Sequence, residues 1–196
     1  MMIRSRSLKS FGAVPPSALL LAMLLMPIAA GATTLLRMSV ETLSQAAGVI
    51  VRAQCLENSA GWDAGEIWTF TSFEVKEVWS GSAPARITVR LLGGRVGDFT
   101  SSVSGVPRFR PGENVVLFLE ATPRGDFSVV SWQQGTFRIR RDVRSGEENV
   151  TQDTASFATF DPATRRFVAA GIRTLPLDTF RARVDAARRA RTRSKP

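Results

Sequence analysis

The reactive residue types in this chain limit the chemistry that it can perform. Its 196 residues include no histidine, no tyrosine and a single cysteine, Cys55. Within this chain, serine–histidine–aspartate and cysteine–histidine catalysis are therefore excluded, as are histidine-ligated metals and iron–sulfur clusters. Cys55 follows an apolar segment, so we expect a buried, inert thiol. The groups left for catalysis or binding are carboxylates, arginines and aromatic rings.

Several carboxylates lie close together in the sequence, and they are the only candidates for acid–base work. They are Asp63 with Glu66, Glu147 with Glu148, and Asp98 in a long loop. A carbohydrate-active hydrolase would need two such groups about 5 to 10 Å apart in one cleft. No spacing here brings two of them together, and none matches a calcium-binding loop. We therefore predict no catalytic residue, metal site or cofactor. The hydrolase is kept as an alternative, so enzymatic activity stays an open question.

The segment from Gly93 to Gly112 is the strongest candidate for a binding surface. Loops of this length inside compact domains are uncommon and are usually functional or disordered. Apolar residues are spaced through this one, which argues against plain disorder. It is therefore either a packed structural flap or a loop that binds a partner. The candidate binding residues are Phe99, Val103, Arg108, Phe109 and Glu113.

The end of this segment has the residues of a tight turn before a core strand. Arg110-Pro111-Gly112-Glu113 places proline second and glycine third, as a type II turn requires. Glu113 is expected to accept turn amides, or to pair with Arg108 or Arg110. Because each residue has a mechanical task, we interpret the turn mainly as scaffold.

The net charge of +9 is concentrated near the C-terminus. Residues 33–180 carry equal numbers of basic and acidic side chains, so no nucleic-acid-binding face is expected. The basic residues of 181–196 are Arg181, Arg183, Arg188, Arg189, Arg191, Arg193 and Lys195. Arg188, Arg189, Arg191 and Arg193 could hold an anionic lipid or polysaccharide surface, which is the second alternative function. The simpler interpretation is a solvated, frayed helix end.

The first 32 residues have the order of a secretory signal peptide. Basic residues precede a short apolar segment, Ser17–Met26, and small residues at Ala30 and Ala32 offer a cleavage site. The apolar segment is shorter than the roughly 20 residues of a membrane-spanning helix, so a membrane anchor is less favoured. We expect an exported protein, periplasmic or secreted, with one β-rich domain at 33–180 and a basic helix end at 181–196.

The elements that must position these residues are short strands separated by turns. A short helix is expected over 38–48, with Ser39 as its cap, and a closing helix over 177–190. Strands are expected at 49–57, 66–79, 86–92, 113–120, 127–132, 135–141 and 148–151. A bulge is expected near Lys76-Glu77, and surface loop over 151–174. The predicted fold is mainly β, an antiparallel OB-like barrel or small sandwich with a short N-terminal helix and a C-terminal helix.

Three motifs carry a resemblance to a known group of proteins. The order "EVWSG", "ITVRLLGG" and "GVPRFRPGENVVLFL" resembles an uncharacterised family of exported bacterial β-proteins with a Gly-x-Pro-x-Phe-x-x-Gly-Glu corner before an apolar strand. The matching positions are Gly81, Gly93, Gly94, Pro107, Phe109, Gly112 and Glu113. That family implies export but no activity.

More faintly, the strand order is similar to the OB barrel of netrin-like domains, including tissue inhibitors of metalloproteinases. Those inhibitors use an N-terminal cysteine, which this sequence lacks, so their mechanism is not implied. The function expected from the sequence is that of an exported non-enzymatic β-barrel module. It would bind an unknown protein partner, in the cell envelope or outside it, through its loops and without nucleic acid.

Overall fold

The computed structural model describes residues 35–152, 159–161, 164–168 and 171–193. The chain divides into two units, Met1–Ala32 and Thr33–Pro196, and all described residues belong to the second. The predicted signal peptide lies outside the described residues and stays a prediction. Within the described ranges, neither helix combines the length and apolar character needed to cross a membrane.

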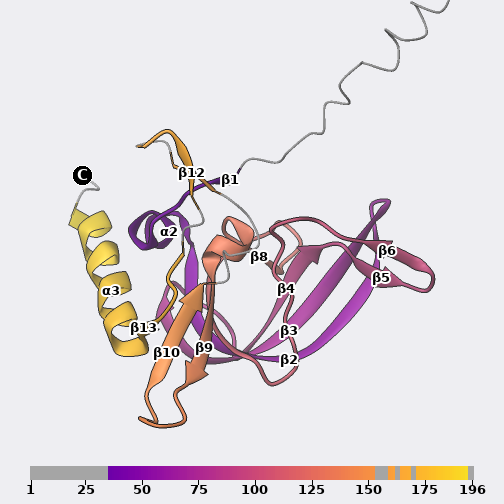
Figure 1. Ribbon diagram of the computed structural model, residues 1–196. Coiled ribbons are helices and arrows are strands. Elements are labelled where there is room, and N and C mark those ends of the chain that lie inside the picture. Colours follow the sequence, from indigo (N-terminus) through magenta and orange to yellow (C-terminus); the bar gives the residue numbers. More distant parts are fainter. Residues whose placement is uncertain (1–34, 153–158, 162–163, 169–170, 194–196) are drawn as a thin grey trace, which may run out of the picture. The chain divides into compact units, whose positions relative to one another are not determined.

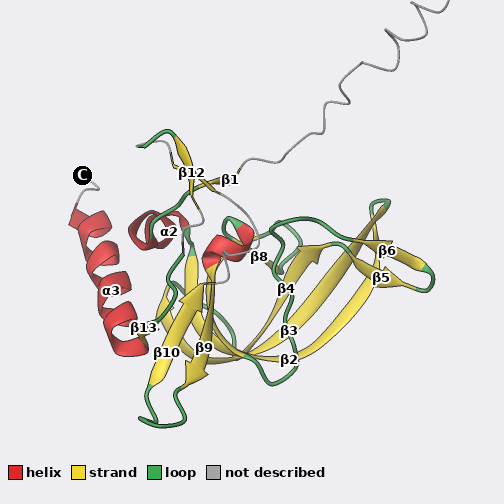
Figure 2. Cartoon of the chain, in the orientation of Figure 1, coloured by secondary structure: helices red, strands yellow, loops and turns green. Residues whose placement is uncertain are grey.

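The described chain is mainly β, as the sequence predicts, and most of its strands form one large sheet (Figures 1 and 2). The strand order is β13-β10-β9-β7-β2-β3-β4-β8. The bounds are β2 Val49–Asp63, β3 Glu66–Ser80, β4 Arg86–Leu92, β7 Asn114–Ala121, β8 Phe127–Val129, β9 Thr136–Arg141, β10 Glu148–Gln152 and β13 Leu175–Pro176. A short 3₁₀ helix, Trp132–Gly135, joins β8 to β9.

Five of these strands form a ring of pairings in the order β2-β3-β4-β8-β7, because β7 pairs with both β8 and β2. The mainly β fold with one large mixed sheet is confirmed, whereas the closed OB-like barrel stays a prediction. Four of the five pairings in the ring are antiparallel, in agreement with the mainly antiparallel prediction, and β4 and β8 are parallel. β4 and β8 pair at a single residue pair, Val89 and Phe127, so the two strands do not share a continuous ladder of hydrogen bonds.

The hairpin of β2 and β3 is longer than the sequence predicts. The first strand was expected to end at Glu57, with a turn-rich segment after it, but β2 continues to Asp63. Ala64 and Gly65 form the turn, both with positive φ (51° and 83°), as a two-residue hairpin turn requires. The ladder with β3 overrides the weak strand propensity of 58–61. The expected bulge in β3 is confirmed, because the pairing register skips Lys76.

The core consists of two clusters, one on each face of the sheet. The first includes Val51, Phe73 and Val89. The second lies between the sheet and the helices, and includes Ile50, Phe118, Phe137 and Phe180. Strand β7 contributes to both, with Val115, Leu117 and Leu119 in the first cluster and Val116 and Phe118 in the second. This explains its almost continuous apolar sequence, since both of its faces are buried.

Both predicted helices are confirmed. Helix α2 spans Val40–Ala46, and the Ser39 hydroxyl accepts a hydrogen bond from the Thr42 amide at 3.1 Å. Helix α3 spans Leu177–Arg193. Its predicted apolar stripe, which consists of Leu177, Phe180, Val184 and Ala187, is buried.

Two segments that were expected to be loops contain short strands. The long segment after β4 forms a hairpin of β5, Gly94–Val96, and β6, Phe99–Ser101. The segment expected as surface loop over 151–174 contributes to a small sheet. Its strands are β1 Leu35–Leu36, β11 Thr159–Asp161 and β12 Arg166–Val168. Strands of two or three residues carry too little periodicity to be recognised from sequence.

Candidate functional site

The predicted turn before β7 is present and is tied to β2. Gly112 has φ of 84°, and the Glu113 amide donates to the Arg110 carbonyl at 3.0 Å, as in a type II turn. The Gly112 amide donates to the Cys55 carbonyl, and the Cys55 amide to the Glu113 carbonyl, both at 2.8 Å. These bonds fix the entry of β7 against β2, so the turn has the structural role that the sequence predicts.

Glu113 joins this turn to β9. Its carboxylate accepts the Arg110 amide at 3.2 Å, which confirms the expected turn contact. Its ion-pair partner is Arg138 of β9, whereas Arg108 and Arg110 were the partners expected. The Arg138 guanidinium also donates to the Arg108 carbonyl at 2.8 Å and lies 5.7 Å from the Phe109 ring centre. Arg138 lies opposite Val115 in the β7–β9 ladder, and this non-local register is what the sequence does not show.

The predicted binding residues divide into buried and exposed groups. Phe109 is only 6% exposed and packs edge-to-face on Phe73, with ring centres 5.0 Å apart. It is therefore mainly a core residue, and it also lines the polar hollow described below. Val103 is partly buried against the first core cluster. Phe99 is 64% exposed and lies edge-to-face on Trp62, which is 54% exposed, with ring centres 5.7 Å apart.

The exposed aromatic pair borders an apolar hollow between two hairpins. Trp62 lies near the tip of the β2–β3 hairpin, and Phe99 begins β6. The hollow has a volume of about 300 Å³, and its apolar lining includes Ile67, Leu92 and Val103 besides the two rings. Sequence reasoning missed Trp62, because its segment was interpreted as a turn.

A second, polar hollow lies beside the first and shares Thr100 and Ser101 with it. Its volume is about 400 Å³, within the range of small-molecule sites. The polar side chains that line it belong to Asn58, Thr69, Thr71, Thr100, Ser101, Ser102 and Arg108. Leu91 and Phe109 are its apolar residues. The Arg108 guanidinium donates to the Thr69 hydroxyl and the Gly93 carbonyl, each at 3.2 Å.

A third hollow of about 310 Å³ is lined by arginines around one carboxylate. Its lining consists of Arg108, Arg110, Glu113, Arg138 and Arg140. Three hollows therefore surround the segment that the sequence singled out, and Arg108 belongs to two of them.

The loop acid Asp63 is held by two arginines and is not free for acid–base work. Arg124 donates to both of its oxygens, at 2.5 and 2.6 Å, and Arg90 of β4 also pairs with it. These hydrogen bonds, first from Arg124 and then from Arg90, hold the pKa of Asp63 below its usual value. Arg90 lies 4.3 Å from the Trp68 ring centre and 3.7 Å from the Asp126 carboxylate. The cluster therefore clamps the long hairpin to β4 and to the β7–β8 turn.

The other carboxylates do not converge on a hollow. The polar hollow is lined by none, the arginine hollow by Glu113 alone, and the apolar hollow by Glu66 alone. Glu148 pairs with Arg52 at 2.9 Å. Across the residues that the structure describes, no group of three histidine, cysteine or acidic side chains could hold a metal ion.

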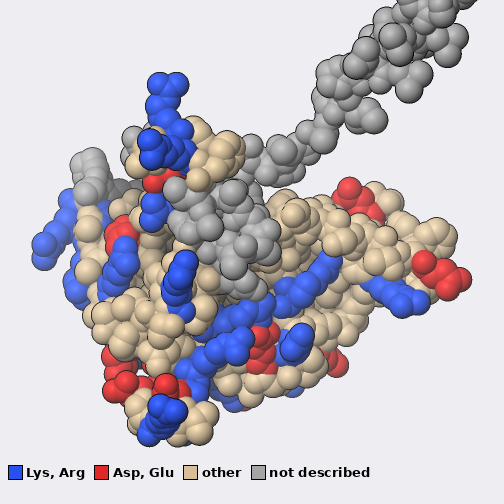
Figure 3. Space-filling view, viewed as in Figure 1, with Lys and Arg blue, Asp and Glu red and all other residues tan. Residues whose placement is uncertain are grey.

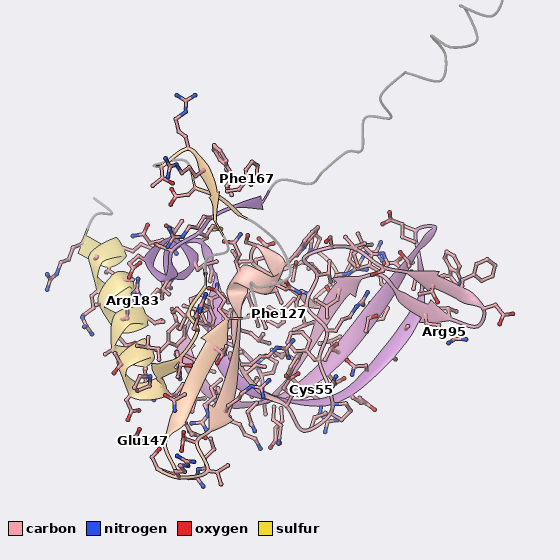
Figure 4. All side chains as sticks on the ribbon, viewed as in Figure 1. Cys55, Arg95, Phe127, Glu147, Phe167 and Arg183 are labelled. Carbon is pink, nitrogen blue, oxygen red and sulfur yellow. The ribbon has the colours of Figure 1, made fainter. Side chains whose placement is uncertain are left out.

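Cys55 is buried, as expected, and Figure 4 shows it among the strands of the main sheet. Burial raises the pKa of its thiol to about 11, with a further contribution from the negative charge of Glu113. A thiol with so high a pKa is almost entirely protonated near neutral pH and is a poor nucleophile.

The predicted basic tail is helical as far as Arg193, and two of its arginines bond to helix α2. Arg188 donates to the carbonyls of Ser44 and Ala47, at 2.9 and 3.1 Å, and Arg191 donates to the Gln45 carbonyl at 2.6 Å. These carbonyls lie at the C-terminal end of α2, where positive charge is favoured. Burial, and then the nearby charge of Arg191, lower the pKa of Arg188.

The remaining tail candidates are exposed, as Arg191 is. Arg189 and Arg193 are both exposed on α3, while Lys195 lies outside the described residues. The tail arginines therefore fall into two groups. Arg188 and Arg191 stabilise the packing of α3 on α2, whereas Arg189 and Arg193 are exposed to solvent.

Comparisons with known proteins do not place the chain in a family. No protein-family model matches it, and no curated protein sequence matches it either. The resemblance to exported bacterial β-proteins and the fainter one to netrin-like domains therefore stay predictions.

Proposed function

We propose that this protein is an exported module that binds a protein partner through the tips of its β2–β3 and β5–β6 hairpins. The observation that carries the proposal is the exposed edge-to-face pair of Trp62 and Phe99 beside the apolar hollow. Large aromatic side chains are enriched at protein–protein interfaces, where they supply much of the binding free energy. Export is inferred from the N-terminal sequence alone.

The frame under the aromatic pair is held in place before any partner binds. The Gly93 amide donates to the Ile67 carbonyl at 2.7 Å, and the Thr69 hydroxyl donates to the Gly93 carbonyl, also at 2.7 Å. Gly94 approaches β3 closely, because a Cβ placed there would lie 2.6 Å from the Thr69 hydroxyl. These contacts order the start of the β5–β6 hairpin, which lowers the entropy lost on binding.

The two alternatives receive less support. A hydrolase would need two carboxylates in one cleft, and each of the three hollows has at most one. A surface binder acting through the tail would use Arg188, Arg189, Arg191 and Arg193. Two of these, Arg188 and Arg191, are already bonded to α2 carbonyls.

The test is to replace both exposed rings and measure recovery of crosslinked complexes from the protein's own cell envelope. With Trp62→Ser and Phe99→Ser combined, we expect recovery to fall at least about tenfold, as loss of an aromatic hot spot would give. The matched control is Phe167→Ser. Phe167, which is labelled in Figure 4, is 62% exposed in β12 and lies edge-to-face on Phe160. It is far from the two hairpins in sequence.

The melting temperature of each variant separates binding from folding. Because both rings of the aromatic pair are largely exposed, we expect the double variant to melt within a few degrees of the wild type. Complexes that persist in the double variant, or that are lost equally in Phe167→Ser, would refute the proposal. If every variant that loses complexes also unfolds, the hairpins have a structural role and do not form the binding surface.

A further inference from the structure

The polar hollow has the lining of a site for a hydroxyl-rich ligand. Its exposed hydroxyls come from Thr100 and Ser102, and Ser101 is partly exposed. The buried Thr71 hydroxyl donates to the Asn58 side chain at 2.7 Å, and the Asn58 amide donates to the Phe109 carbonyl at 3.1 Å. The floor is therefore fixed by internal hydrogen bonds, while the hydroxyls of the rim have free bonding capacity.

Arg108 gives this hollow a positive charge that no neighbouring acid balances. Its guanidinium contacts two neutral oxygens, on Thr69 and Gly93, and no carboxylate contact of Arg108 occurs among the described residues. No acidic side chain lines the hollow. An arginine presents five N–H donors in a planar fork that matches a carboxylate. The two bonds that hold Arg108 leave donors for a ligand.

Arg108 also lines the arginine hollow, so the two hollows are adjacent. That hollow has four guanidinium groups and one carboxylate. Arg138 and Arg140 are two residues apart on β9, so their side chains leave the same face of the strand about 7 Å apart. Arg140 is exposed, and basic side chains gather next to acidic ones on this face of the molecule (Figure 3). The charge excess there favours a ligand with more than one anionic group.

We propose that these two hollows form one binding site for a short acidic oligosaccharide, with its hydroxyls in the polar hollow and a carboxylate in the arginine hollow. Hydroxyl and amide side chains beside the apolar residues Leu91 and Phe109 suit a sugar ring, because the polar groups exchange hydrogen bonds with its hydroxyls. A purely charged ligand would use the arginines but would leave the hydroxyls of Thr100 and Ser102 unused.

This site goes beyond the proposed function and does not depend on it. The aromatic pair lines the apolar hollow, whereas neither Trp62 nor Phe99 lines the two polar hollows. Thr100 and Ser101 line both the polar and the apolar hollow, but Arg108 and Arg140 do not line the apolar hollow, so the two arginine variants report on this site alone and either proposal could fail alone.

The test is calorimetric titration of the purified protein with three probes. They are tetragalacturonate, the neutral tetrasaccharide maltotetraose, and tripolyphosphate. We expect tetragalacturonate to bind more tightly than the other two. Arg108→Gln or Arg140→Gln removes one charge-assisted contact, which should weaken tetragalacturonate binding about tenfold or more. Thr100→Val, which removes only a hydroxyl, should weaken it by a few-fold.

Two controls keep the result interpretable. Arg141→Gln removes an exposed arginine of β9 that lines neither hollow, and it should leave binding unchanged. No side-chain hydrogen bond or ion pair of Arg140 occurs among the described residues, so Arg140→Gln tests the site even if Arg108→Gln unfolds the loop. Equal or tighter binding of tripolyphosphate, unaffected by Thr100→Val, would overturn the saccharide assignment in favour of simple charge attraction. The absence of binding by any probe at millimolar concentration would also overturn it.

Discussion

Replacing Glu113 by glutamine tests whether its contact with Arg138 is a desolvated ion pair that holds β7 and β9 together. The side chain of Glu113 is 21% exposed and that of Arg138 is 15% exposed. Breaking a fully buried ion pair costs about 3–5 kcal/mol, whereas exposed pairs contribute about 0–1 kcal/mol. With most of each side chain removed from water, we expect Glu113→Gln to lower the free energy of unfolding by about 2 kcal/mol.

The assay is thermal or urea unfolding at neutral pH. For a domain of this size, about 2 kcal/mol corresponds to a fall in melting temperature of about 4–8 °C. The matched control is Glu74→Gln. Glu74 is 49% exposed and pairs with Lys76 at 2.6 Å on the same sheet. The Glu74→Gln substitution should lower the free energy of unfolding by less than about 0.5 kcal/mol.

Salt dependence gives the second comparison. Screening weakens exposed pairs much more than partly buried ones, so the effect of Glu113→Gln should persist in 1 M salt (about a 3 Å screening length). Equal losses for Glu113→Gln and Glu74→Gln, or a Glu113 effect that disappears in high salt, would refute the argument that this pair is desolvated.

Three further predictions follow from the charged, glycine and thiol positions. The hydrogen bond from Arg183 lowers the pKa of Glu41 to about 2 from 4.5, so the stability from this pair is complete above pH 4.5 and is lost as pH falls towards 2. Because Glu41 is 44% exposed, the loss should stay below about 1 kcal/mol, and Glu41→Gln should remove this part of the pH dependence in urea unfolding. Gly81→Ala should lower the free energy of unfolding by more than about 2 kcal/mol, because Gly81 has φ of 78° and a Cβ there would lie 2.4 Å from a neighbouring backbone carbonyl oxygen. Gly61→Ala, with no atom within 4 Å of the added Cβ, is its control, and equal losses would contradict the reasoning. Cys55, whose pKa is about 11, should resist alkylation at pH 8 until urea unfolds the protein, and rapid labelling of the folded protein would disagree with its burial.

The elements with a strong local pattern could be predicted from the sequence. Helix α3 repeats apolar residues on one face, and all four predicted stripe residues are buried. Strand β7 is buried on both faces, and this burial is visible in its own sequence as an almost continuous apolar segment. By contrast, the extension of β2 over Asn58–Asp63 depends on its ladder with β3. The propensity of that segment alone favours a turn.

The candidate site could be predicted only in part. The segment from Gly93 to Gly112 was singled out for its length, and the residues that border it in the structure lie elsewhere in the chain. Trp62 and Arg138 reach it through hairpin length and strand register, which are not local properties. Phe109 was predicted as a binding residue, and its burial against Phe73 depends on a non-local contact that the sequence does not show.

The two core clusters also differ in when they can be completed as the chain leaves a ribosome or a membrane channel from its N-terminus. Every buried residue of the first cluster lies between Val49 and Val129. The second cluster needs Phe180 and Val184, which come more than 50 positions later. Until those residues emerge, the rings of Phe118 and Phe137 are not packed against Phe180. A chain stalled before residue 177 should therefore expose an aggregation-prone aromatic surface on one face of the sheet. The last helix therefore sets the moment at which the protein ceases to need protection from aggregation.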